Sequence, residues 1–320
     1  MRARELKQLL AQTAKLTPSQ REQLRGHLST GLALDQATAI VEGRMARRPG
    51  CPKCQALRVV RNGQADGLQR YKCRSCGVTF NTLTGTPLAR LRHRDKWLEQ
   101  AQGMDEGLSV RKAAARMEVH RTTAFRWRHR FLALPREVKA AKLAGVAEAD
   151  ETYVLRSYKG QRRKLLAEQT RKPRHRGGKA AKRGLSAEQV PILVLRNRAG
   201  QTTDHVLEAA NKRCVAEVLQ PDLADDAVLC TDGSGMLAKV ASELGIEHHA
   251  VNTSRGEHTR GAWHIQNVNA YHSRFKQWMR RFNGVASSYL PNYLGWFRAL
   301  DRNAQSGAKT PSLLALAVGA

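Results

Sequence analysis

The sequence predicts a multidomain α+β protein with N-terminal helices, a four-cysteine zinc ribbon, a helix-turn-helix, and then an α/β domain with C-terminal helices. Three observations predict it. The chain of 320 residues is too long for one ordinary core. Two CxxC pairs lie between residues 51 and 76. From residue 146 onward, short apolar runs alternate with helical patterns, which is typical of a domain that layers helices on a sheet.

The charge is strongly unbalanced. Lys and Arg number 55 against 27 Asp and Glu, so the formal net charge is +28 and the sequence pI is near 10.7. Such a chain repels itself unless a polyanion neutralises it, and the common cellular polyanion is nucleic acid. No apolar stretch approaches the roughly 20 residues that span a bilayer. We therefore expect double-stranded DNA, and no membrane, as the partner.

Residues 1–48 are predicted to form a helical segment. The first residues, MRARELKQLLAQTAKL, have charged residues and leucines at helical spacing and lack the apolar core of a signal peptide, which favours a cytoplasmic, nucleoid-associated location. A second helix is predicted to begin after Thr17. Thr17 can cap it, Pro18 suits its first position, and Gln20 completes a capping box.

Residues 49–82 contain the metal-binding motif. Each CxxC directs two thiolates at one point, and the alternating, turn-containing segment between the pairs predicts a hairpin that brings them together. Four thiolates leave no open position for water, so one structural Zn²⁺ is expected; two unrelated surface turns are the alternative. Two other cysteines, Cys214 and Cys230, have no matching spacing and are expected in the core. The predicted zinc ligands are Cys51, Cys54, Cys73 and Cys76.

Residues 90–140 are predicted to be a helix-turn-helix DNA-binding domain. A helix from Asp95 to Gly103 precedes one over 110–116 that Ser109 can cap, and residues 117–119 form the turn. The helix after His120 would then read the major groove. An ordinary helical hairpin with a solvated basic face is the alternative. The predicted DNA contacts are Arg121, Thr122, Thr123, Arg126 and Arg130.

Residues 145–305 are predicted to be the catalytic domain, followed by a C-terminal tail over 306–320. Three strands are expected in VAEADETYVL, PILVLRNRAG and DDAVLCTDGSG, then a short one in HHAVN and two long helices after Trp263. The insertion 156–184 carries twelve Lys or Arg and one acid, so it is expected to order on phosphate or else to be merely solvated. Its predicted DNA contacts are Arg174, Arg176, Lys179, Lys182 and Arg183.

The candidate catalytic residues lie in three separate segments. Asp150 and Asp232 lie on or just after predicted strands, and open α/β sheets bind ligands at strand ends. Asn269 and Lys276 are about two helical turns apart, so they share a face. Oxygen ligands from distant segments suit two Mg²⁺ (or Mn²⁺) ions, while Lys276 would contact substrate phosphate.

Three nearby residues are further candidates for the same site. Glu151 follows Asp150 directly, so on a regular strand it points to the opposite face and is read as secondary. Glu257 and His264 are alternatives for the third ligand position.

The order of these motifs resembles one family. A four-cysteine ribbon, a helix-turn-helix and then ADETYV, CTDGSG and HIQNVNAYHSRFKQW are similar to insertion-sequence transposases of the ISXO type, over the chain from Cys51 to about Leu300. RKPRHRGGKAAKRG and NYLGWFRAL also resemble family features. The resemblance implies an RNase H-like catalytic domain with an Asp-Asp-Glu or Asp-Asp-Asn triad. The triad falls on Asp150, Asp232 and Asn269, accompanied by Lys276.

The resemblance also implies an activity. Such proteins cleave DNA at the ends of their element with Mg²⁺ and use the 3′-hydroxyl to attack target DNA, as a multimer on terminal inverted repeats. Asn at the third position follows one branch of the family. The alternatives are a zinc-ribbon and helix-turn-helix regulator, a structure-selective nuclease on the same fold, and a domesticated, weakly active derivative. Metal-dependent cleavage and use of a 3′-hydroxyl nucleophile distinguish them.

Overall fold

The protein is described from a computed structural model that covers residues 2–161, 163, 167, 180, 186, 188–252, 255–306 and 313–319. The chain forms two compact units. One comprises residues 1–131 together with 311–320, and the other comprises residues 132–310. Within the described residues, no helix combines the length and the apolar character needed to cross a membrane.

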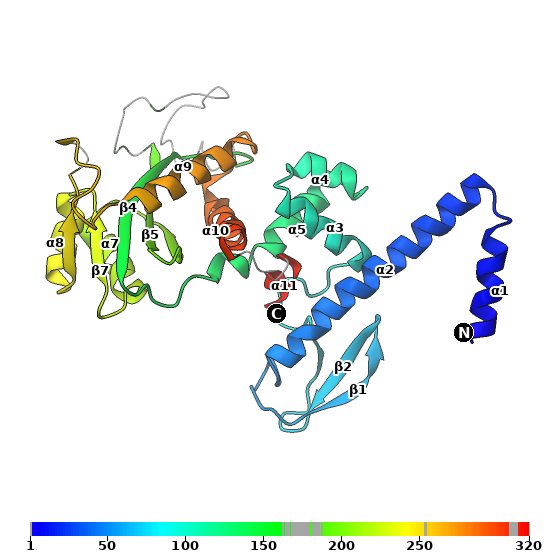
Figure 1. The fold of residues 1–320 in the computed structure, drawn as a ribbon. Coiled ribbons are helices and arrows are strands. Elements are labelled where there is room, and N and C mark those ends of the chain that lie inside the picture. The colour runs from blue at the N-terminus through cyan, green and yellow to red at the C-terminus, as the bar shows by residue number, and fades with distance from the viewer. Residues whose placement is uncertain are drawn as a thin grey trace. The chain divides into compact units, whose positions relative to one another are not determined.

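Two helices open the first unit, α1 (Ala3–Thr13) and α2 (Pro18–Arg47) (Figure 1). The predicted capping box is confirmed, because the backbone N–H of Gln20 donates to the Thr17 hydroxyl and that of Thr17 donates to the Gln20 side chain. The C-terminal half of α2 is fastened to the ribbon that follows it. The carboxylate of Glu42 accepts from the N–H of Gln69 at 2.9 Å, which holds the helix against a strand.

The ribbon is a three-stranded antiparallel sheet of β1 (Val59–Ala65), β2 (Leu68–Cys73) and β3 (Thr79–Asn81), in that order. Asp66 and Gly67 join β1 to β2, with φ of 52° and 67°. A two-residue hairpin with positive φ at both positions matches the strand twist and favours the Asp-Gly dipeptide. Cys51, Cys73 and Phe80 make a small buried core beside it. The predicted hairpin between the cysteine pairs is therefore present.

The helix-turn-helix contains α3 (Trp97–Asp105), α4 (Val110–Arg116) and α5 (Arg121–Phe131), preceded by a short 3₁₀ turn over Arg94–Lys96. Ser109 caps α4 by accepting from the N–H of Lys112, as predicted. The turn between α4 and α5 passes through Glu118 in the left-handed region, with φ of 51°. Ala124 and Trp127 of α5 are buried, as the sequence predicts.

The first unit also receives the end of the chain. Helix α11 (Leu313–Val318) packs against α2, α3 and α5 and buries five of its six residues. The segment that the sequence suggests is a tail thus contains a helix that belongs to the core of the first unit. Its apolar run, LLALAV, is too short for its period to distinguish a helix from a buried strand.

The second unit is built on a five-stranded sheet. Its strands are β4 (Val146–Leu155), β5 (Gln189–Asn197), β6 (Thr202–Val206), β7 (Val228–Thr231) and β8 (Glu247–Ala250). The order is β6-β5-β4-β7-β8, with β4, β5 and β6 antiparallel and with β7 and β8 parallel to β4. This mixed order is that of the RNase H-like fold, as predicted.

Helices cover both faces of this sheet (Figure 1). On one face, α7 (Lys212–Asp222) and α8 (Gly235–Glu243) close a core that includes Ala147, Ala149 and Leu229. On the other face lie α9 (Gln266–Arg280) and α10 (Leu290–Ser306). These two helices pack through aromatic rings, namely Tyr271, Phe275, Trp278, Phe282, Tyr293, Trp296 and Phe297. The packed rings hold α9 and α10 as one layer on the sheet.

The segment that enters the second unit is pinned to α10. A 3₁₀ turn, Pro135–Glu137, runs so close to α10 that the backbone of Arg136 lies against Gly295. Arg298, one turn further along α10, donates to the carbonyl oxygens of Val138 and Arg136 at 3.0 and 2.8 Å. The same guanidinium pairs with the carboxylate of Asp204 on β6 at 2.5 Å, in the unit's interior. The entering segment is therefore part of the second unit.

Candidate active site, zinc centre and DNA-binding elements

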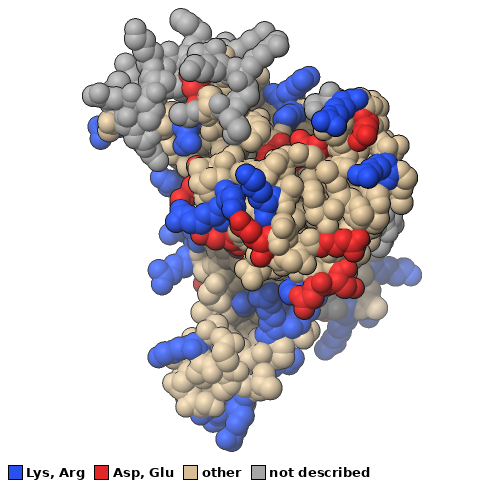
Figure 2. All heavy atoms as spheres, turned by 90° about the vertical axis from the view of Figure 1, so that its left-hand side faces the viewer, with Lys and Arg blue, Asp and Glu red and all other residues tan. Residues whose placement is uncertain are grey.

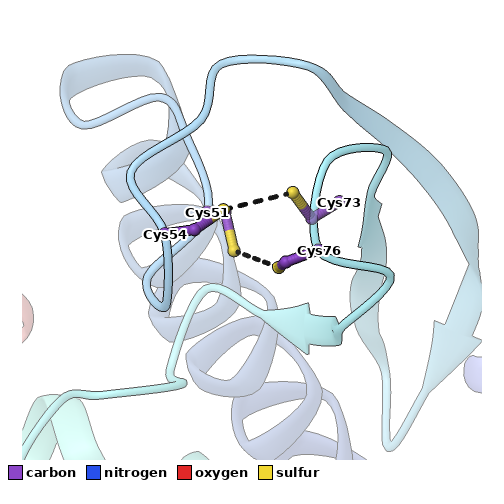
Figure 3. Close-up of side chains that lie close together, drawn as sticks. All are labelled: Cys51, Cys54, Cys73 and Cys76. Atoms are coloured by element: carbon purple, nitrogen blue, oxygen red, sulfur yellow. Dashed lines mark hydrogen bonds between the residues drawn. The ribbon is translucent and has the colours of Figure 1, made fainter.

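The four cysteines of the CxxC pairs meet at one point (Figure 3). Their sulfur atoms lie within 4.8 Å of one another, with 3.6 Å between Cys51 and Cys76 and between Cys54 and Cys73. Tetrahedral zinc at about 2.3 Å from each sulfur requires sulfurs about 3.8 Å apart. The N–H of Cys76 donates to the sulfur of Cys73 and lowers the pKa of that thiol to about 6, which favours the thiolate form. The four residues therefore form the predicted structural zinc site.

Replacing Cys73 by serine is expected to remove about one equivalent of zinc per chain and to unfold the ribbon, because three thiolates no longer close the tetrahedron. Metal analysis of the purified protein, together with amide hydrogen exchange over β1 and β2, measures both effects. Cys214→Ala is the matched control, since Cys214 is buried in the second unit away from this cluster. Full zinc content and protected β1 and β2 in the serine variant would contradict the assignment.

Asp150 lies on β4, and Asp232 follows the neighbouring parallel strand β7. Glu148 of β4 is in register with Cys230 of β7. Asp150 and Asp232 each follow this pair by two residues, and adjacent strands are about 4.8 Å apart. Residues two apart on a strand share a face, so the carboxylate of Asp150 lies with that of Glu148 on the α9 side. Asp232 lies just after β7, where its Oδ1 accepts from the N–H of Ser234 at 2.9 Å.

Negative charge is crowded around Asp150, Glu151 and Asp232. Burial, followed by the charges of Asp150 and Asp232, raises the pKa of Glu151 to about 7. Burial and the same three carboxylates raise the pKa of Tyr153 to about 12. One oxygen of Glu151 is buried without a hydrogen-bond partner. Because the carboxylates repel one another here, a bound cation would stabilise the site.

Helix α9 brings further residues to this place. His272 is buried, and its Nδ1 lies 3.4 Å from a carboxylate oxygen of Asp150. Asn269, one turn earlier, and Lys276, one turn later, share that side of the helix, and both are exposed. The side of α9 that carries the predicted residues therefore faces Asp150. His272 is absent from the sequence-derived site, although its three-residue spacing from Asn269 is the signal that could have found it.

The two alternatives for the third ligand are engaged elsewhere. The ring of His264 lies 3.4 Å from Glu148 and contacts the guanidinium of Arg198. Glu257 is exposed, and its carboxylate accepts from the N–H of Asn252 at 3.3 Å. Asn269 therefore stays the preferred third residue, on the strength of its position next to His272.

The helix-turn-helix presents its basic side chains on α5. Arg121, Thr122 and Arg126 are exposed, and Thr123 is half-buried. Arg130 donates to the carbonyl oxygens of Pro87 and Ala89, so its guanidinium also fastens α5 to the preceding segment. The predicted contacts of the basic insertion, Arg174, Arg176, Lys179, Lys182 and Arg183, lie outside the described residues.

The charge excess is unevenly spread. On the face drawn in Figure 2, acidic and basic side chains both occur among uncharged ones. This face therefore does not form one continuous basic surface. We expect the DNA contacts on α5 and on the other basic segments.

Arg126→Ala is expected to weaken binding to specific DNA by roughly 5- to 100-fold, the range for losing one bidentate arginine contact to a base. A gel-shift or fluorescence-anisotropy titration at fixed salt measures it. Arg213→Ala removes an equally exposed arginine from α7 and is expected to leave specific binding nearly unchanged. Equal losses in the two variants would show that α5 reads no bases.

The fold and these elements define a class of protein: a DNA-handling, zinc-containing chain whose second unit is an RNase H-like domain. Comparison with known families then identifies the type. Residues 142–298 match the ISXO2-like transposase domain, residues 50–77 the InsA N-terminal domain, a zinc ribbon, and residues 90–136 a homeodomain-like domain. The second unit accordingly carries an ISXO2-like transposase domain, and the resemblance of the chain to insertion-sequence transposases of the ISXO type is confirmed.

A relative and a solved structure accompany these matches. The chain is 29% identical over 255 residues to an uncharacterized protein in transposable element ISH50 of Halobacterium salinarum, covering 78% of this chain and 83% of that protein. A pre-cleavage Mos1 transpososome aligns at 12% identity with a TM-score of 0.20, over 67% of this chain and 79% of that one. The second likeness is too weak to support an argument.

Proposed function

We propose that this transposase binds the terminal inverted repeats of its own element, cleaves the DNA strands there, and transfers the 3′-hydroxyl ends into target DNA with the help of two Mg²⁺ or Mn²⁺ ions. The observation that carries the proposal is the register of β4 and β7. It pairs Glu148 with Cys230, two residues before Asp150 and Asp232 respectively, and His272 of α9 lies against Asp150.

The residues present fit divalent cations. Asp150, Asp232 and Asn269 offer oxygen atoms, the ligands that Mg²⁺ prefers. The pKa of Glu151 is raised first by burial and then by the charges of Asp150 and Asp232, and a cation would relieve the repulsion among these carboxylates. Asp150, Asp232 and Asn269 would hold the ions, which when bound supply activation of the attacking hydroxyl and neutralisation of the leaving oxygen.

The remaining residues bind and position DNA in this proposal. Lys276, exposed on α9 one turn after His272, contacts a substrate phosphate. Helix α5 reads the repeat in the major groove, and the insertion 156–184 contacts the backbone. The active form is a homo-oligomer on DNA, and it acts in the nucleoid.

The test uses the purified full-length protein and a DNA fragment that carries both ends of its element. With Mg²⁺, we expect nicks at the element ends and joined products with target DNA; with EDTA, we expect binding alone. Cleavage without any use of a 3′-hydroxyl end would indicate the nuclease, and binding without cleavage under every metal would indicate the regulator. Short inverted repeats and duplicated target bases in the genomic flanks would support the transposase independently.

A further inference from the structure

We infer that Glu148, a residue outside the predicted site, is a positioning residue that fixes the N-terminus of α9 and through it sets Asn269 over the two aspartates. The inference rests on the proposed function, because it concerns the same site. Glu148 lies on β4 two residues before Asp150, on the same face of the sheet. Its side chain is fully buried.

The carboxylate of Glu148 serves as the cap of α9. One oxygen accepts from the backbone N–H of Val268 at 2.9 Å, and the other accepts from the side chain of Asn267 at 2.8 Å. The helix lacks a local cap of this kind, since its N-cap residue is Ile265, which has no polar side chain. The first N–H groups of a helix need acceptors and attract negative charge. Glu148 of β4 therefore supplies the side-chain cap that the N-cap residue of α9 does not.

Arg198 and His264 complete the arrangement. Arg198 forms an ion pair with Glu148 at 2.6 Å and also donates to the carbonyl oxygen of Ala262 at 3.1 Å. The ring of His264 lies 3.4 Å from the same carboxylate, and its Nδ1 accepts from the N–H of Gln266. The carboxylate of Glu148 thus contacts the end of β5, the loop before α9 and the first turn of α9. A buried charge persists only with such partners.

The geometry explains what this anchor does for the reaction. Asn269 directly follows Val268, whose N–H is bound to Glu148, and His272 lies against Asp150 one turn later. The helix is therefore attached to β4 at two points, and Asn269 lies between them. A change at the first point would rotate or fray the turn that carries Asn269 without removing any proposed metal ligand. Residues that orient metal ligands change affinity by about 10- to 100-fold when altered.

The experiment compares wild type with Glu148→Gln. The glutamine keeps the shape of the side chain, but its amide nitrogen is a donor and would face the groups that donate hydrogen bonds to the carboxylate. Zinc-loaded, full-length protein is titrated with Mn²⁺, and free Mn²⁺ is followed by electron paramagnetic resonance. We expect Mn²⁺ affinity to fall about 10- to 100-fold. Amide exchange should rise over residues 265–270 while the C-terminal half of α9 stays protected. The maximal rate of strand cleavage should fall, whereas the affinity for element-end DNA should not.

Controls separate this inference from the proposed function. Asp222→Asn removes another buried, ion-paired carboxylate, the one bonded to His205, and should leave Mn²⁺ affinity unchanged. If wild type binds no Mn²⁺, or Asp150→Ala binds it equally well, the proposed function fails whatever Glu148 does. If wild type binds Mn²⁺ through Asp150 and Glu148→Gln binds it as tightly, the positioning role is overturned.

A second variant covers the case in which Glu148→Gln does not fold. Asn267→Ala removes one of the two hydrogen bonds from α9 to Glu148 and keeps the carboxylate. We expect a loss of Mn²⁺ affinity of about 2- to 10-fold, at or below the lower end for residues that orient metal ligands, because the hydrogen bond from Val268 to Glu148 remains. Unchanged affinity in this folded variant would also overturn the inference.

Discussion

Replacing Asp150 by asparagine is expected to reduce strand cleavage and strand transfer by at least about 100-fold, because a change to an outer-shell partner alone costs about 10- to 100-fold and this residue is a proposed direct ligand. The substitution keeps the shape of the side chain but removes one negative charge next to Asp232. Cleavage and joining are measured on DNA carrying the element ends, across a range of Mg²⁺ concentrations. Binding to those ends should persist, since α5 lies in the other unit.

The matched control is Asp225→Asn, which removes a fully exposed carboxylate of the same unit that pairs with Lys142 on the surface. Its activity should stay within about twofold of wild type, as expected for an exposed ion pair. Strand transfer at the wild-type rate in Asp150→Asn would exclude this aspartate as a metal ligand. A loss of DNA binding along with activity would point to misfolding.

Replacing Gly295 by alanine should destabilise the second unit by about 3 kcal/mol or more, at or beyond the upper end for overpacked sites. A Cβ placed there would lie 2.3 Å from the Cα of Arg136, 2.7 Å from its nitrogen and 2.9 Å from the carbonyl oxygen of Pro135. All three are backbone atoms, so no side-chain rotation can make room. The 3₁₀ turn would have to move away from α10. Thermal unfolding should show a midpoint lowered by roughly 6 to 12 °C.

Gly235→Ala is the control for this effect. Gly235 begins α8 in the same unit, and nothing lies within 4 Å of a Cβ added there. Alanine should be neutral or slightly stabilising, because glycine is the weaker helix former. An equal melting temperature for the two variants would show that the contact of α10 with the 3₁₀ turn is not tight in solution.

Much of the fold follows from local patterns that the sequence displays. The Thr17 capping box, the paired CxxC motifs and the Ser109 cap each specify a structure within a few residues, and all three are present. Strand β6 and helix α11 were not predicted. TTDHV is short and contains polar residues that are buried only because neighbouring elements cover them, and LLALAV becomes a helix by packing on three others. Both depend on distant parts of the chain.

The candidate site could be predicted only in part for the same reason. Asp232 follows an apolar run, which is a local signal for a strand end, and Asp150 lies within the predicted strand that became β4. Glu148 carries no such signal, because its role depends on which helix begins next to it, 120 residues further along the chain. Whether Asp150, Asp232 and Asn269 act together stays a prediction until the metal and activity measurements are made.

The packing of α11 has a topological consequence. Since Leu313–Val318 completes a core that α2, α3 and α5 begin, residues 132–310 are inserted within the sequence of the first unit. Deleting the final helix should therefore expose apolar surface on α2, α3 and α5 and impair DNA recognition first. An affinity tag or fusion partner at that terminus would act on the same core, so the N-terminus is the safer place for one.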